Sequence, residues 1–372
     1  MTATKTAAAP AKAPLIQLLN GMLVDSSSKL FLIEGIDEEE LAWFKVTIDM
    51  DKDRKIAKEN LDDLEFCKML WSAGMLLSKN HDELKSKITN FLGTAGNCPK
   101  ALAIDTNLIY SRFLQTFLGT VYSKPYEKVP FITVVGRGSN DEMHYKTSSN
   151  YRSMWKADFE AFCKLISQDP NVGLLLTNRN KPDEVASRMK QASSRQGRLG
   201  LKGLLYFREL QAKYQMICSR PLHLYYAKEM SSKMLDGKSG VQYPDAVYDA
   251  IIRHEVEFIR DNTNVDVLFL TADKNSDEAS ETEGLLHQYV QQPTRWADVN
   301  AAGVSIINVD HVEKLLLEFL AFSPFVKISC DGKANNAIYL AYTWIGKLPA
   351  DNLEGRIQAW DGKDVNYYYM RF

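Results

Sequence analysis

The chain has 372 residues, enough for two or three domains that each bury a core. Hydrophobic residues make up 45% and charged residues 25%, and the formal net charge is −2, which excludes a chain that is basic throughout but allows a local basic patch. The sequence shows no run of about 18 apolar residues, so we predict no membrane-spanning helix. The five scattered cysteines, without a CxxC pair, indicate free thiols in a reducing compartment, the cytoplasm.

The first 98 residues are expected to form a tail and a small domain. Residues 1–14 are mostly Ala, Thr, Lys and Pro without the apolar stretch of a signal peptide, and we expect them to be disordered. Residues 15–98 are expected to be an N-terminal α/β domain, with strands near 30–33 and 43–48 and helices over 61–77 and 82–92. This domain carries no chemical motif, so its expected role is packing or binding a protein partner.

Residues 99–323 alternate between strand and helix patterns, which predicts an α/β domain around a parallel sheet. Buried strands are expected at 101–104, 129–135, 265–270 and 304–309. Helices are expected at 108–121, 245–259 and 312–322, with a further helix beginning at Glu283 and reaching Tyr289.

A basic segment from about 151 to 240 is expected to be a helical insertion in this domain. Between Arg179 and Arg220 there are ten Lys or Arg residues and only three acids. The Ser, Gly and cations from Ser193 to Lys202 suit close approach to a phosphate backbone, although a solvated helical face would show the same charges. The candidate nucleic-acid-binding residues are Arg188, Lys190, Arg195, Arg198, Lys202 and Arg208.

Residues 324–372 alternate apolar and polar positions in short runs separated by turn signals such as Asp331-Gly and Asp361-Gly. This pattern predicts a small antiparallel β domain. Its aromatic residues could bind nucleic acid, but a β domain of this size needs them for its core.

Four acids stand at comparable places in the central domain. Asp105 and Asp273 each close a buried strand, Asp249 lies one turn into a helix, and Glu142 lies at a helix start, where Asp141 is an alternative. Clustered carboxylates repel one another, so a fold tolerates them mainly when divalent cations neutralise them. Oxygen ligands in this number suit Mg²⁺ or Mn²⁺, and the chemistry that uses such a site is displacement at phosphorus.

The segments Ile104-Asp-Thr-Asn-Leu108, Asp249-Ala-Ile-Ile252 and Leu268-Phe-Leu-Thr-Ala-Asp273 resemble the acidic motifs of PIN-domain nucleases in the family's order. The resemblance covers about 101–309. It implies a three-layer α/β/α fold around a parallel sheet, with Asn107 and Thr271 as polar supports of the acids and Asp277 as a supplementary metal-site acid. It also implies metal-dependent cleavage of RNA or, less often, DNA.

We therefore expect a Mg²⁺- or Mn²⁺-dependent endoribonuclease that cleaves single-stranded RNA through a metal-bound hydroxide held by the four carboxylates. One alternative is a catalytically silent nucleic-acid-binding scaffold in a processing complex. Another is a structure-specific, flap-type DNA nuclease, which would use the same acids.

Overall fold

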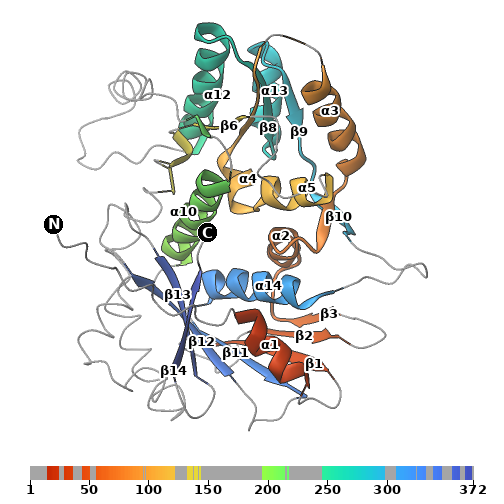
Figure 1. Cartoon of the computed structure of the whole chain (residues 1–372), viewed down its shortest axis with the longest axis vertical. Coiled ribbons are helices and arrows are strands. Elements are labelled where there is room, and N and C mark those ends of the chain that lie inside the picture. The colour runs from red at the N-terminus through yellow and green to blue at the C-terminus, as the bar shows by residue number, and fades with distance from the viewer. Residues whose placement is uncertain are drawn as a thin grey trace, which may run out of the picture. The chain divides into compact units, whose positions relative to one another are not determined.

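The computed structural model of the chain describes residues 15–24, 29–36, 44–50, 56–94, 96, 98–121, 132–136, 138–140, 142–143, 195–213, 216–217, 245–297, 307–323, 325–331, 338–345, 354–360 and 365–370. Over these residues the protein has a mixed α/β fold, with an antiparallel sheet, a parallel sheet and a two-stranded ribbon (Figure 1). The chain divides into two compact units. Among the described residues, the first unit takes in those up to Leu61 and those from Ile307 onward, and the second takes in those from Asp62 to Ala297.

The first unit is built on a seven-stranded antiparallel sheet with the strand order β14-β13-β12-β11-β1-β2-β3. Its strands are β1 (Leu30–Ile36), β2 (Phe44–Asp49), β3 (Ile56–Glu59), β11 (Phe325–Cys330), β12 (Ile338–Ile345), β13 (Glu354–Trp360) and β14 (Val365–Met370). Strand β1 pairs with β11 from Phe31↔Cys330 to Ile36↔Phe325. This pairing joins strands from both ends of the chain into one sheet.

Helix α14 (Val309–Phe322) packs on this sheet through contacts with β11 and β12, and α1 (Leu15–Val24) packs against α14. Asn308 is the N-cap of α14, and its side chain accepts a hydrogen bond from the His311 amide at 2.8 Å. The ring of Phe319 lies 5.2 Å from that of Phe44 on β2. Phe44, Val46 and Ile48 alternate along β2 and are fully buried, so the core lies between this face and α14.

The second unit is built on a five-stranded parallel sheet with the strand order β7-β6-β5-β8-β9. Its strands are β5 (Lys100–Ile104), β6 (Ile132–Val135), β7 (Met216–Ile217), β8 (Asp266–Thr271) and β9 (His287–Tyr289). The described helices are α2 (Asp63–Ser72), α3 (His81–Gly93), α4 (Thr106–Tyr110), α5 (Phe113–Val121), α10 (Arg195–Lys213), α12 (Asp245–Asn262) and α13 (Lys274–Thr282). A ribbon pairs β4 (Leu76–Ser78) with β10 (Pro293–Trp296).

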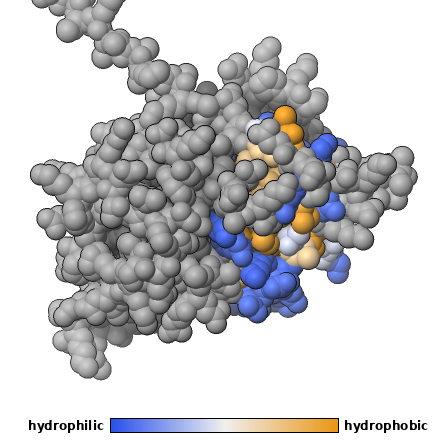
Figure 2. Space-filling view, turned by 90° about the horizontal axis from the view of Figure 1, so that it is seen from below, coloured by the Kyte–Doolittle hydropathy of each residue, from blue (hydrophilic) through white to orange (hydrophobic). Residues whose placement is uncertain are grey.

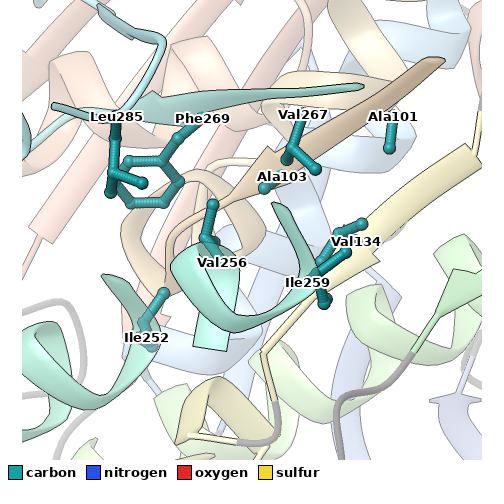
Figure 3. Close-up of a cluster of buried hydrophobic side chains, with 9 residues drawn as sticks. All are labelled: Ala101, Ala103, Val134, Ile252, Val256, Ile259, Val267, Phe269 and Leu285. Atoms are coloured by element: carbon teal, nitrogen blue, oxygen red, sulfur yellow. The ribbon is translucent and has the colours of Figure 1, made fainter. Parts of the chain in front are cut away.

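Helix α12 covers one face of the parallel sheet. The buried cluster between them consists of Ala101, Ala103, Val134, Ile252, Val256, Ile259, Val267, Phe269 and Leu285 (Figure 3). Because side chains alternate along a strand, Leu102, Leu268 and Leu270 point to the opposite face, and they are buried too. Burial on both faces is typical of parallel sheets in α/β proteins.

The strand order reverses between β5 and β8. From β5 the chain continues to β6 and β7 on one side of the sheet, and from β8 it continues to β9 on the other side. Such a reversal leaves a crevice at the carboxyl ends of the strands, where open α/β sheets bind ligands. The parallel register ends at Ile104↔Leu270, so Asp105 and Thr271 emerge next to each other at this place.

Most expected strands are confirmed, including β5, β8 and the four strands from β11 to β14. The expected helix at 108–121 is interrupted by Arg112, whose φ of +50° separates α4 from α5. The expected helix at 61–77 ends at Ser72, and β4 follows it. The basic insertion is described only at 195–213 and 216–217, as α10 and β7. Of the expected strand at 304–309, residues 304–306 lie outside the described residues, whereas 307–308 have no regular structure and Val309 begins α14, so this part of the expectation is wrong.

The expected helix from Glu283 to Tyr289 is wrong. The helix lies earlier, as α13, because the side chain of Asp273 caps its first turn. Gly284 follows with a φ of +69°, a conformation that few other residues adopt and that stops the helix. The residues from His287 to Tyr289 then form β9.

The grouping of the segments also differs from the expected division at residues 98 and 323. The strands of 30–59 and 325–370 form one sheet, and α2, β4 and α3 belong to the second unit. Both differences come from pairing between distant segments, such as β4 with β10, for which a local pattern carries no signal.

No helix among the described residues is long and apolar enough to cross a membrane. The exposed large hydrophobic side chains Val24, Leu64, Phe258 and Leu286 belong to separate segments of the chain. On the face seen in Figure 2, the hydrophobic side chains of the described residues are interspersed with hydrophilic ones.

Candidate metal centre

Asp105 closes β5 and is 3% exposed. Its Oδ2 accepts hydrogen bonds from Thr271 Oγ1 at 2.5 Å and from the Ala272 amide at 3.1 Å, and its Oδ1 accepts one from the Leu108 amide at 2.9 Å. The pKa of this carboxyl is raised from 3.8 to about 6, and burial is the main cause; the three hydrogen bonds act in the opposite direction, and the charge of Asp273 acts in the same direction as burial. Asp105 is thus held rigidly, and its Oδ1 keeps capacity for a further ligand.

Asp273 lies after β8 and is the N-cap of α13. Its Oδ1 accepts from the amides of Asn275 at 2.7 Å and Ser276 at 3.1 Å. Among the described residues nothing donates a hydrogen bond to its Oδ2. The Thr271 hydroxyl, which donates to Asp105, also accepts from the Asp273 amide at 3.0 Å. One buried threonine therefore connects the two acids that close β5 and β8.

Asp249 lies one turn into α12 and is partly buried. Its pKa is raised from 3.8 to about 7, first by burial and then by the charges of Asp273, Asp105 and Glu142. Arg253 lowers this pKa, but its guanidinium is engaged by Glu283 at 2.9 Å. Within the described part of the chain Asp249 has no ion-pair partner. The ionised form of Asp249 is therefore destabilised by the neighbouring carboxylates.

Glu142 is 5% exposed and lies in a short helical stretch that follows β6. Its charge acts on Asp249, so the four expected acids are electrostatic neighbours at the carboxyl ends of the parallel strands. Asp141, the alternative to Glu142, lies outside the described residues.

The other expected site residues are placed as follows. Thr271 is fully buried between the acids, whereas Asn107 is exposed. Asp277 lies in the first turn of α13 with its Oδ1 3.3 Å from His287 Nε2. Burial raises the pKa of Asp277, and the charges that act on it come from His287, Glu281, Lys87 and Glu278. The structure thus groups Asp277 with His287 rather than with the four acids.

The six expected nucleic-acid-binding cations are only partly described. Lys202 and Arg208 are half-buried on α10. Arg195 and Arg198 belong to the same helix, but their side chains lie outside the described residues, as do Arg188 and Lys190 altogether.

Helix α10 is fastened to α4, the helix that follows Asp105. A methyl group added at Gly203 would lie 2.4 Å from the Tyr110 ring and 2.8 Å from Met143 Sδ, so only glycine allows this approach. Met143 is the neighbour of Glu142. The basic helix therefore packs directly beside two segments that carry acids of the cluster.

Sequence reasoning missed the ion pair that locks this junction. Arg112 is 8% exposed and Glu209 is 2% exposed, and their side chains meet through contacts of 2.8 to 3.1 Å. The guanidinium also lies 4.9 Å from the centre of the Tyr206 ring. The two partners are 97 residues apart, so the sequence carried no local signal for the pair.

The donor set fits a hard divalent cation, because all four acids supply oxygen and two of them are held by hydrogen bonds. Within the described residues, however, no three His, Cys, Asp or Glu side chains converge into a metal cage. Mutual repulsion keeps ionised carboxylates apart, and Mg²⁺ commonly uses only one or two carboxylates and retains several waters. A cation here would therefore need water for most of its ligands.

Comparisons with protein-family models, with curated proteins and with solved structures found no match to this chain.

Proposed function

We propose that this chain is a Mg²⁺- or Mn²⁺-dependent phosphodiesterase of the PIN type that cleaves single-stranded RNA. The observation that carries the proposal is Asp249, a partly buried acid without an ion-pair partner in the described residues, placed in the field of three other acids. Asp105 and Asp273 serve as helix caps, which would explain them without any chemistry. Asp249 has no such role, and costly groups of this kind cluster at functional sites.

The PIN-like three-layer arrangement is part of this proposal. It is supported by the parallel sheet, whose two faces are buried, and by the reversal of strand order between β5 and β8. Three acids stand in the motifs that resemble those of the family. Asp105 and Asp273 follow the carboxyl ends of β5 and β8, and the charges of both raise the pKa of Asp249.

The chain's own residues would divide the work in a simple way. Asp105, fixed by three hydrogen bonds, and Asp273, fixed by two backbone amides, provide rigid oxygen ligands. Asp249 and Glu142 complete the negative charge that attracts the cation. When bound, a divalent cation at such a site offsets charge on the phosphate and lowers the pKa of water.

Helix α10 supports a nucleic-acid substrate. Its sequence contains five basic residues, Arg195, Arg198, Lys202, Arg208 and Lys213, and one acid, Glu209. The charge of Glu209 is neutralised by its buried ion pair with Arg112. Lys202 directly precedes Gly203, whose backbone lies against Met143, so a cation stands one residue from the contact to the Glu142 segment. A phosphate backbone held along α10 would thus pass beside the acids.

Cleavage by wild-type protein and by Asp105→Asn tests the proposal. The purified protein is incubated with single-stranded RNA, single-stranded DNA and a flap substrate, with EDTA and then with excess Mn²⁺. We expect Mn²⁺-dependent cleavage of RNA, and a loss of about 100-fold or more in Asp105→Asn, since several kcal/mol of charge stabilisation depend on the metal site.

The matched control is Asp266→Asn, which removes an exposed acid at the opposite end of the same parallel sheet, where Asp266 pairs with Lys100. It should cleave like wild type. Preference for the flap would move the proposal to a DNA nuclease. Tight RNA binding without cleavage at any Mn²⁺ concentration would identify a scaffold instead.

A further inference from the structure

Helix α12 carries a further buried carboxylate, in addition to the acids of the candidate metal centre. Glu255 is 1% exposed and lies six residues after Asp249. Its Oε2 accepts a hydrogen bond from the Gly138 amide at 3.1 Å. Burying a carboxylate costs free energy unless it is hydrogen-bonded, so the partner of a buried carboxylate shows which part of the structure it positions.

Through this hydrogen bond Glu255 contacts the turn that connects β6 to Glu142. This turn is tight, because the Ser139 amide donates to the Gly136 carbonyl at 3.1 Å, and residues 138–140 and 142–143 are helical. The turn is therefore the short connection that carries Glu142 from the end of β6 to its place beside the other acids.

The backbone of this turn lies directly against α12. A methyl group added at Gly136 would lie 2.4 Å from Glu255 Oε2, and one at Gly138 would lie 3.0 Å from Ile251 Cγ2 and 3.2 Å from Ile252 Cγ1. Ile252 also packs into the core beneath α12 (Figure 3). Two glycines thus let the turn approach a helix that is itself fixed against the sheet.

We propose that Glu255 is a positioning residue that sets the place of Glu142 relative to Asp249. One rigid helix then fixes two acids of the centre, Asp249 directly and Glu142 through the Glu255–Gly138 hydrogen bond. This inference rests on the proposed metal-dependent function. Groups that orient metal ligands commonly change metal affinity 10- to 100-fold when they are removed.

The test compares Glu255→Met, which keeps the length of the side chain but lacks the acceptor, with Glu255→Gln, whose amide oxygen can still accept from Gly138. Mn²⁺ binding is measured by calorimetry on the full chain, and hydrogen exchange of the 136–143 backbone is measured without metal. We expect Glu255→Met to bind Mn²⁺ about 10- to 100-fold more weakly and to lose protection at Gly138, with Glu255→Gln within about threefold of wild type.

A double-mutant cycle separates positioning from a general structural role. On a Glu142→Gln background, Glu255→Met should weaken Mn²⁺ binding by less than about threefold, because the ligand that it positions is already lost. An equal loss on both backgrounds would overturn the inference. If Glu255→Met does not fold, Gly136→Ala displaces Oε2 from Gly138 by a different route and is expected to weaken Mn²⁺ binding in the same direction.

The failures of the two proposals are distinguishable. Tight Mn²⁺ binding by wild type that Glu255→Met and Gly136→Ala leave unchanged overturns the role of Glu255 and leaves the metal centre standing. Absence of Mn²⁺ binding by wild type overturns the proposed function, and the positioning role with it.

Discussion

The acids at the carboxyl ends of the parallel strands differ in what they contribute to the fold. Asp105 and Asp273 accept backbone hydrogen bonds that start α4 and α13, so each stabilises a helix while it adds charge to the cluster. Asp249 only adds charge. The negative charge that Asp249 adds to the site therefore lowers the stability of the fold, and no helix cap compensates for it.

We expect Asp249→Asn to stabilise the metal-free protein at neutral and alkaline pH. The pKa of Asp249 is about 7 in the folded chain and 3.8 as its ordinary value, so between these values the folded state binds more protons than the unfolded state. The stability of wild type therefore falls as pH rises through this window. Removing the charge should raise the free energy of unfolding by about 1–2 kcal/mol at pH 8, after allowance for solvent screening of a partly buried group.

Urea unfolding in EDTA at several pH values measures this effect. The gain should shrink as the pH falls from 7 toward 4 and should vanish near pH 3, where both forms are neutral. Mn²⁺ should stabilise wild type but not Asp249→Asn. A variant that is less stable than wild type at pH 8 would show that Asp249 has a favourable contact, and the charge argument would fail.

For individual helices and strands, the region around α4 and α10 shows which features sequence patterns predict and which they do not. Apolar spacing identified the helical character of 108–121, and an acid after an apolar run located the ends of β5 and β8. The left-handed φ of Arg112 had no local sequence signal, and neither had the buried ion pair that Arg112 forms with Glu209, which is distant in sequence. The mutual arrangement of the acids was expected only from motif order, and the location of Glu255 against Gly138 gave no sequence signal.

We expect this ion pair to be sensitive to the loss of one partner and tolerant to the loss of both. Arg112→Met leaves Glu209 as a buried charge without its guanidinium, which should lower the free energy of unfolding by about 3–5 kcal/mol. The double variant Arg112→Met, Glu209→Leu removes both charges and should lie within about 2 kcal/mol of wild type, with some loss from the contact between Arg112 and Tyr206. Urea denaturation of the single and double variants measures both values. If the losses were additive, the two side chains would not be coupled.

At the scale of the whole chain, the sequence revealed strands and helices but not which of them share a unit. The strand β1 finds its partner in β11, almost 300 residues later, so the N-terminal and C-terminal segments complete each other's sheet. In the same way, α3 and β4 are tied to the second unit. Asn80 donates to the Tyr289 carbonyl at 2.8 Å, and Lys87 donates to the His287 carbonyl at 2.8 Å. Such pairings depend on three-dimensional closure, which local periodicity does not encode.

The stabilities of two fragments test whether the domain boundaries seen in the structure or those expected from the sequence are correct. Residues 62–306 contain the second unit with α2, β4 and α3, whereas 99–323 is the central domain expected from sequence and lacks them. The shorter fragment exposes the surface of α5 against which the side chains of Trp71 and His81 pack, with ring centres 6.0 and 5.3 Å from Phe113 and Phe117. Because burying one large apolar side chain contributes roughly 1.5–3 kcal/mol, we expect 62–306 to unfold cooperatively and 99–323 to be less stable by at least about 3 kcal/mol. Urea unfolding followed by circular dichroism measures the difference, and equal stability of the two fragments would show that α2 and α3 are not part of the unit that carries the acids.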